Sequence, residues 1–427
     1  MKLITCLFFI CGLQYCSAQG TDTTARLAAA YFKELKLAVQ DQHIWKEPVY
    51  GPMLLVFPES HLAYANEPDS AGILKPVDGV YKGSLPSSMI IGNTAVEWGG
   101  KTWSMVMWPP PADRDARLNL LAHESFHRIQ KRMGLPMRSP TVDFLGTMQG
   151  RIYFLLELQA LKAALAQPTD NRGIDLGNAL LFREKLHQLF PKTFETERLL
   201  EMNEGLAEYT GVMLGRPAAT IPAHLDRIID SAENQKSLIR SAAYITGPVY
   251  GYLLFQKAPD WTLKIDSNAD FAELLSAYYH IKRVNAVSDE ELQKAQKLYP
   301  YDAIVAAEGL KEKKRLQMAK YYTELFTQKT VLTLTLHQMN VGFDPRNLFD
   351  LGDYGTVYPT AQVKDDWGQL EVSGNGMLMK NWHVVTLPAA GIQAAGDTLK
   401  GDGWLLHLNI GWKLVKKDEY HYLLEHL

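Results

Sequence analysis

The sequence contains very little cysteine, and this scarcity limits its chemistry. Only three cysteines occur in 427 residues, and all of them, Cys6, Cys11 and Cys16, lie near the N-terminus. Removal of a signal peptide over residues 1–18 would take away all three. We therefore expect the mature chain to have no disulfide, no catalytic cysteine and no cysteine-bound metal. A metal in such a chain has to be held by histidine and carboxylate side chains.

The first residues have the pattern of a secretory signal peptide. Lys2 supplies a positive charge, residues 3–13 form an apolar run, and small residues at 16–18 precede the predicted cleavage point. This pattern predicts a secreted or periplasmic protein. The alternative is lipid attachment at Cys16, and the bulky residue before it, Tyr15, argues against that alternative.

Long apolar runs and a strong charge of either sign are also missing. After the leader, no run reaches the roughly 18 apolar residues of a membrane-spanning helix, so we expect no integral membrane segment once the leader is removed. The formal net charge is only -3, and the one strong basic run, residues 311–315, is interrupted by Glu312. Nucleic acid is therefore not an expected partner. The sequence has neither a phosphate-binding glycine loop nor a Gly-x-Ser-x-Gly nucleophile turn.

The pattern of apolar residues predicts an α+β protein in three parts after the leader (1–18). Residues 19–111 combine one amphipathic helix with short apolar segments broken by Gly and Pro, typical of a small sheet. Residues 112–328 are mainly helical, with Asp113 as the expected N-cap of the first helix. Residues 329–427 alternate between apolar and polar and predict an antiparallel β module, with Asn375-Gly376 as a tight hairpin turn.

The chemistry is concentrated in the segment His123-Glu124-Ser125-Phe126-His127. On a helix, residues four apart are only about 40° apart in azimuth, so both imidazoles lie on one face, one turn apart, and can reach one ion. Glu124 then lies beside the ion, where a carboxylate can act as general base. The alternative is two histidines and a glutamate on the solvent side of an amphipathic helix.

A catalytic zinc with two imidazoles needs a third protein ligand and keeps a fourth position for water. The residues after His127 supply no further histidine nearby, so the third ligand has to come from elsewhere. Glu204 is the best candidate, with Glu208 one helical turn later on the same face. We place Glu204 on the metal and Glu208 behind it, where it accepts the free N–H of His123 and fixes the tautomer. Solvent-exposed glutamates remain the alternative for both positions.

These residues resemble the gluzincin class of zinc metallopeptidases, which includes the thermolysin-like enzymes. His123, Glu124 and His127 match the His-Glu-x-x-His motif, and Asn203-Glu204 with Glu208 is similar to the Asn-Glu-x-x-x-acid motif. The resemblance covers roughly residues 95–255. It implies a zincin-like catalytic domain, in which a small sheet with a peptide-binding edge strand and the two metal helices precede a helical half.

Further expectations follow from this resemblance. Residues 103–108 occupy the place of the edge strand, and Tyr244 and Tyr250 are the candidate donors to the oxyanion, with packed core tyrosines as the alternative. The expected cofactor is Zn²⁺ and the expected substrate is a peptide or protein. The competing hypothesis is an exported binding protein with a structural or vestigial metal site, in which the β module contacts an unknown protein partner. A hydrolase of non-peptide amides is a third alternative.

Overall fold

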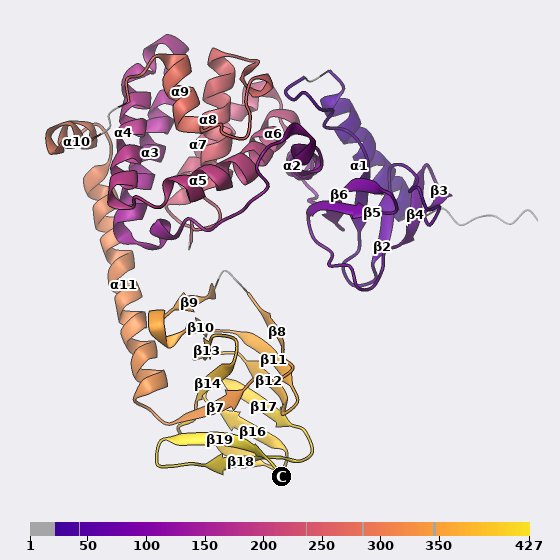
Figure 1. Cartoon of the computed structure of the whole chain (residues 1–427), viewed down its shortest axis with the longest axis vertical. Coiled ribbons are helices and arrows are strands. Elements are labelled where there is room, and N and C mark those ends of the chain that lie inside the picture. Colours follow the sequence, from indigo (N-terminus) through magenta and orange to yellow (C-terminus); the bar gives the residue numbers. More distant parts are fainter. Residues whose placement is uncertain (1–21, 42, 236, 284–285, 345–346) are drawn as a thin grey trace, which may run out of the picture. The chain divides into compact units, whose positions relative to one another are not determined.

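The computed structural model describes residues 22–41, 43–235, 237–283, 286–344 and 347–427 (Figure 1). Its fold is α+β, as predicted. The predicted signal peptide and the three cysteines lie outside these residues. Two compact units are present: the first comprises Met1–Val142, Leu158–Ala232 and Arg240–Ala286, and the second Asp143–Glu157, Glu233–Ile239 and Val287–Leu427. Within the described part, no helix is both long and apolar enough to cross a membrane.

The first unit begins with one helix and a six-stranded sheet. The helix α1 (Thr23–Val39) starts at Asp22, whose carboxylate accepts a hydrogen bond from the Ala25 amide as an N-cap. The sheet has the order β3-β4-β2-β1-β6-β5, in which only the described pair β1–β6 is parallel. Its strands are β1 (Met53–Val56), β2 (Leu62–Ala65), β3 (Lys75–Val77), β4 (Val80–Ser84), β5 (Thr94–Trp98) and β6 (Lys101–Met107).

The expected edge strand is at the wrong place in the sequence. Residues 103–108 were predicted to form it, but they belong mainly to β6, which lies between β1 and β5. The edge is β5, which forms a hairpin with β6 through Gly99 and Gly100, both with positive φ. Neighbours pair with the backbone of β6 on both sides, and its side chains are buried by α2 and by an apolar cluster that includes Trp103 and Met105. Apolar alternation identifies a strand, but it does not identify the neighbours of that strand.

Helices make up the rest of the first unit. The helix α2 begins after Asp113, whose side chain accepts a hydrogen bond from the Ala116 amide, so the predicted cap is confirmed. The helix α3 contributes its first residues to the second unit and the remainder to the first. The helices are α2 (Arg114–Gln130), α3 (Met148–Ala166), α4 (Gly173–Leu189), α5 (Phe194–Leu200), the π-helix η4 (Glu201–Gly205), α6 (Leu206–Gly215), α7 (Ile221–Ala232), α8 (Ala243–Lys257) and α9 (Phe271–Tyr279).

Glycines let the central helices approach closely. A Cβ on Gly211 of α6 would lie 2.7 Å from the carbonyl oxygen of Asn119 on α2. A Cβ on Gly247 of α8 would overlap the backbone of Gly205 at the end of η4. The α2–α6 and α8–η4 contacts therefore depend on positions without side chains, and they hold together the elements that carry His123, His127 and Glu204.

A buried ion cluster fixes the start of the helix that carries Glu204. The Arg183 guanidinium on α4 lies 2.6 Å from Glu201 Oε2 and 3.1 Å from Glu197 Oε2. Breaking a buried cluster of this kind costs several kcal/mol, about 3–5, because the remaining charges stay buried without a partner. This cluster therefore anchors the segment from α5 to η4 against α4.

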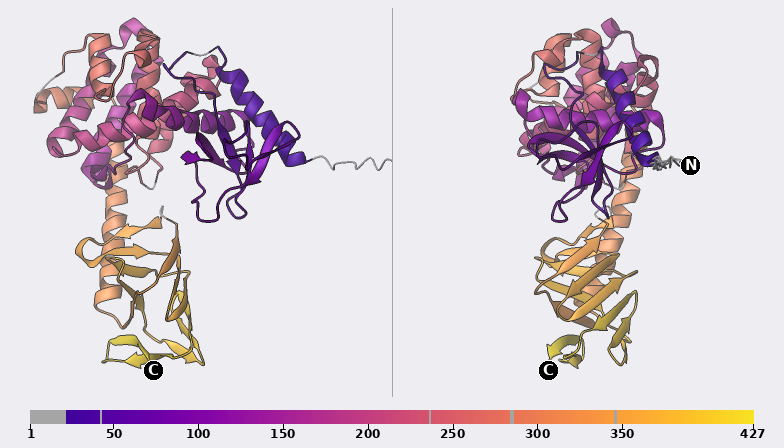
Figure 2. Two further views of the ribbon diagram at one scale, coloured as in Figure 1. Left: turned by 45° about the vertical axis from the view of Figure 1, so that its right-hand side comes forward. Right: turned by 90° about the vertical axis from the view of Figure 1, so that its right-hand side faces the viewer.

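The second unit contains a long helix and a β module. It includes α10 (Asp289–Gln296) and α11 (Tyr301–Thr327), and a buried ion pair joins Arg151 Nε to Glu308 Oε2 at 2.8 Å. The two sheets of the module pack face to face around one apolar core, in which Leu332, Leu370 and Leu406 are fully buried (Figure 2).

The two sheets are mainly antiparallel, as predicted. The first has the order β18-β19-β7-β14-β13-β10-β9 and the second β15-β16-β17-β12-β11-β8, and only the described pair β19–β7 is parallel. The strands are β7 (Val331–Thr335), β8 (Asn340–Phe343), β9 (Phe349–Asp350), β10 (Thr356–Tyr358), β11 (Ala361–Asp365), β12 (Gly368–Val372), β13 (Met377–Lys380), β14 (Val384–Pro388), β15 (Gln393–Ala395), β16 (Thr398–Gly401), β17 (Trp404–Leu408), β18 (Trp412–Lys416) and β19 (His421–His426).

The hairpin expected at Asn375-Gly376 is wrong. Both residues have positive φ, as a tight turn of this type requires. However, the strands on either side, β12 and β13, belong to different sheets. The turn therefore passes the chain from one sheet of the sandwich to the other, because local turn chemistry sets the backbone angles and not the pairing of the strands.

Candidate metal centre

Three predicted ligand side chains meet in the first unit. The Nε2 atoms of His123 and His127, one turn apart on α2, are 3.2 Å from each other. Glu204 Oε2, from the π-helix η4, lies 3.5 Å from His123 Nε2 and 3.6 Å from His127 Nε2. The sequence motif and the distant glutamate thus converge on one point.

The spacing of these atoms fits a small divalent cation. A tetrahedral zinc ion with bonds of about 2.0–2.1 Å to nitrogen and oxygen places its ligand atoms about 3.3 Å apart. The observed separations of 3.2, 3.5 and 3.6 Å lie within a few tenths of an ångström of that value. His123, His127 and Glu204 form a group that could hold a metal ion.

The third predicted ligand, Glu204, lies on an irregular turn of helix. Residues 201–205 form a π-helix, in which the amide of Leu206 donates to the carbonyl of Glu201 five residues earlier. Single π-turns inserted in α-helices occur frequently at functional sites. Here the wider turn joins α5 to α6 and carries Glu204 on the side that faces α2. Nothing in the pattern of residues indicated this turn.

Glu208 lies behind His123, as predicted. Its Oε2 is 3.0 Å from His123 Nδ1, and its Oε1 accepts a hydrogen bond from Asn119 Nδ2 at 3.0 Å. An N–H at Nδ1 that donates to this carboxylate leaves the lone pair of Nε2 for a cation. Glu208 therefore orients His123 from behind the ligand group.

A series of hydrogen bonds supports the other two predicted ligands, His127 and Glu204. His127 Nδ1 lies 2.9 Å from Gln130 Oε1, and Gln130 Nε2 donates to Asn203 Oδ1 at 2.9 Å. Asn203 Nδ2 donates to Ser139 Oγ at 2.7 Å, and Ser139 Oγ donates to Glu204 Oε1 at 2.6 Å. This series thus links His127 to Glu204 and leaves Glu204 Oε2 facing the two histidines.

Gln130 and Ser139 were not among the site residues predicted from the sequence. Gln130 follows His127 by three residues on the same helix, a spacing at which side chains are neighbours, so that signal was present. Ser139 lies in an irregular segment between α2 and α3, and nothing in its local sequence indicates that it contacts Glu204.

Glu124 is buried beside the ligand group and carries an unused oxygen. Its Oε2 atom has no hydrogen-bond partner among the described residues. A buried acceptor without a partner costs about 1–3 kcal/mol, so such an atom calls for an explanation. Burial raises the pKa of Glu124 above its ordinary value, although the nearby His123 and His127 act to lower it.

The two candidate oxyanion donors have different surroundings. The Tyr244 hydroxyl donates to Glu204 Oε2 at 2.6 Å, and its ring stacks on His123 with a centroid separation of 5.6 Å. Tyr250 is fully buried, its ring stacks on Phe271, and the Arg183 guanidinium lies over it. These are the contacts of a core tyrosine, so we retain Tyr244 alone beside the ligand group.

The carboxylates around His123 favour its protonated form. Burial acts to lower the pKa of His123, but contacts with Glu204 and Glu208 outweigh burial and raise this pKa to about 10. Burial acts to raise the pKa of Glu204, but the two histidines, Ser139 and Tyr244 hold it far below its ordinary value. A cation at this point would replace the proton of His123 and pair with the same carboxylates.

Comparisons of the chain with models of protein families, with curated proteins and with solved structures each found no match. The gluzincin resemblance therefore stays a prediction that rests on a few residues. What the chain does has to be inferred from the geometry of its site.

Proposed function

We propose that this protein is a zinc-dependent peptidase of the gluzincin class, with His123, His127 and Glu204 as its zinc ligands. One observation carries the proposal: the buried Glu124 Oε2 has no partner among the described residues and belongs to the helix that supplies two ligands. A structural metal site has no use for such an oxygen, whereas a metallohydrolase needs a base there.

Two further features support a catalytic site over a structural one. Within the described residues, the group has three histidine or carboxylate members, which is the number that a catalytic zinc takes from the protein. The sheet edge β5 also contacts α2, and an exposed edge strand can pair with an extended peptide. Both features agree with a zincin-like catalytic domain.

The proposed reaction is hydrolysis of a peptide bond. When bound, a zinc ion would polarise the scissile carbonyl and lower the pKa of a water molecule. Glu124 then removes a proton from the attacking water as a carbon–oxygen bond forms, and it delivers that proton to the amine nitrogen as the carbon–nitrogen bond breaks.

The other residues of the centre position the reacting groups. Glu208 and Gln130 hold the rings of His123 and His127 through their Nδ1 atoms. Tyr244, whose hydroxyl already lies at the ligand group, donates a hydrogen bond to the carbonyl oxygen as negative charge develops there. The second proton of the water also passes to the amine, so the products are a carboxylate and an ammonium group.

The proposal is tested by profiling cleavage of a peptide library with the zinc-loaded protein and its Glu124→Gln variant. We expect the variant to bind zinc stoichiometrically, because all three ligands remain, and to lose roughly 10²–10⁴-fold in cleavage rate. The matched control is Glu59→Gln, at an exposed position on the same unit, which should leave the rate unchanged.

Three outcomes would contradict the proposal. The first is full activity of Glu124→Gln, and the second is an absence of stoichiometric zinc in the unmodified protein. The third is a zinc-loaded protein that cleaves no peptide in the library, which would favour a binding protein or a hydrolase of other amides.

A further inference from the structure

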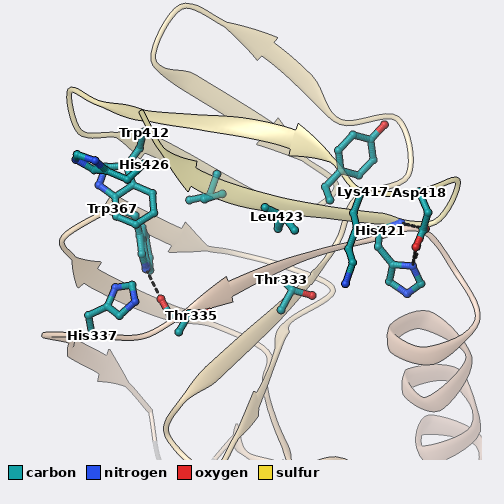
Figure 3. Close-up of a pocket in the computed structure, with 12 residues that line it drawn as sticks. Thr333, Thr335, His337, Trp367, Trp412, Lys417, Asp418, His421, Leu423 and His426 are labelled. Carbon is teal, nitrogen blue, oxygen red and sulfur yellow. Dashed lines mark hydrogen bonds and ion pairs between the residues drawn. The ribbon is translucent and has the colours of Figure 1, made fainter.

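The β module of the second unit contains a cavity that the proposed peptidase chemistry does not use. It has a volume of about 590 Å³ and is bounded by β7 and the β18–β19 hairpin (Figure 3). Cavities that bind small molecules commonly measure about 300–1,000 Å³. The cavity is therefore large enough for a small ligand with one or more rings.

One end of the cavity is aromatic. Trp412 is half-buried, and its ring lies 6.2 Å from the ring of His337 and 5.3 Å from that of His426. Trp367 is buried and donates its indole N–H to the Thr335 carbonyl at 3.0 Å, and this hydrogen bond fixes the orientation of the Trp367 ring. Figure 3 shows these side chains gathered at one end of the cavity. Trp412 thus offers part of a flat apolar ring to an occupant.

The other end of the cavity is polar and nearly balanced in charge. Asp418 accepts hydrogen bonds from two backbone amides and lies 2.7 Å from His421 Nδ1, so Nε2 of that imidazole stays available. Lys417 extends from the hairpin toward the strand that carries Thr333 (Figure 3), and its ammonium has no ion pair among the described residues. This end of the cavity therefore contains one ammonium and one carboxylate.

The hydroxyl groups of the strand β7 complete the lining. Thr333 and Thr335 both face the cavity and can donate or accept hydrogen bonds. The lining therefore combines donors, acceptors and a flat apolar ring without a net charge of one sign. An apolar ligand would leave the polar groups without partners, and a strongly charged ligand would meet Lys417 and Asp418 together.

We propose that this cavity binds a neutral carbohydrate, with a sugar ring against Trp412 and hydroxyl groups toward Thr333, Lys417 and Asp418. Sugar rings have one apolar C–H face and a rim of hydroxyls that both donate and accept, which matches the two kinds of lining. The site is independent of the metal centre, so either proposal can fail without the other.

The test is titration calorimetry of the full chain with neutral di- and trisaccharides of glucose, mannose, galactose, xylose and N-acetylglucosamine. Inorganic phosphate and benzoate are run in parallel as an anion and an aromatic acid. We expect at least one saccharide to bind and Trp412→Ala to weaken binding by about tenfold or more. The control is Trp382→Ala, at an exposed tryptophan of the same module that does not line the cavity.

A second variant guards against a folding defect. Thr333→Val keeps the shape of a β-branched side chain and removes one hydroxyl, so it should fold and weaken binding several-fold. The proposal is overturned if no saccharide binds, if phosphate or benzoate binds in place of saccharides, or if binding survives both substitutions unchanged.

Discussion

Replacement of Glu208 by glutamine tests how the proposed metal centre is oriented. The two oxygens of this carboxylate accept hydrogen bonds from two different donors, His123 Nδ1 and Asn119 Nδ2, each at 3.0 Å. A glutamine side chain has one oxygen and one NH₂ group, so with the Asn119 amide in its present orientation Glu208→Gln satisfies only one of these donors. The other donor then faces the NH₂ group, and the His123 ring loses the carboxylate that holds it.

The expected loss in zinc affinity is about 10–100-fold, as is found when the partner of a metal-binding histidine is removed. It corresponds to roughly 1.4–2.7 kcal/mol of binding free energy. The assay is competition for zinc against a chromophoric chelator, with circular dichroism as a check that the variant is folded.

A compensating substitution makes the test specific. In the double variant Glu208→Gln with Asn119→Asp, the glutamine oxygen can accept from His123 while its NH₂ group donates to the new carboxylate. We expect the double variant to recover part of the lost affinity. The reasoning is refuted if Glu208→Gln binds zinc as tightly as the unmodified protein, or if the second substitution weakens binding further.

Other predictions concern pH and helix packing. The pKa of His123 in the metal-free protein is raised to about 10, so zinc has to displace a proton when it binds. We therefore expect zinc affinity to rise about tenfold per pH unit between pH 7 and 9, with about one proton released per zinc. Calorimetry in buffers of different ionisation enthalpy measures this proton release. The same proton stabilises the metal-free fold fully below the unfolded pKa of about 6.5, and this contribution to stability is lost as the pH rises toward 10. Urea unfolding of the metal-free protein at several pH values measures this loss. Gly247→Ala should destabilise the protein by about 1–3 kcal/mol in urea unfolding, because its Cβ meets the backbone of Gly205. Gly309→Ala, where a Cβ meets only the end of the Met148 side chain at 3.7 Å, should stabilise α11 by up to about 1 kcal/mol, and equal effects of the two substitutions would contradict this account.

The helical metal motif illustrates what local sequence can predict. His123 and His127 were expected on one face because a helical turn holds 3.6 residues, and their Nε2 atoms are 3.2 Å apart. Asp113 was likewise expected to cap this helix, and its side chain accepts a hydrogen bond from the Ala116 amide. Such predictions hold because they depend on backbone geometry that neighbouring residues impose on each other.

Other features depended on the fold as a whole. Tyr244 and Tyr250 are equivalent candidates in the sequence, yet Tyr244 contacts Glu204 and Tyr250 packs against Phe271. Likewise, the alternation of residues 103–108 identified a strand, but the sheet order placed it one position inside the edge.

By itself, the sequence determined the helix with its two imidazoles, the cap that starts it and the distant glutamates. The tertiary structure decided which strand forms the edge, which tyrosine reaches the ligands, and that Gln130 and Ser139 link His127 to Glu204. The reason is physical: periodicity fixes the face on which a side chain lies. Contacts between residues far apart in the chain arise only when those faces pack against each other. Helix packing is set by the volumes of the side chains between the helices and by close glycine contacts such as that of Gly247 with Gly205.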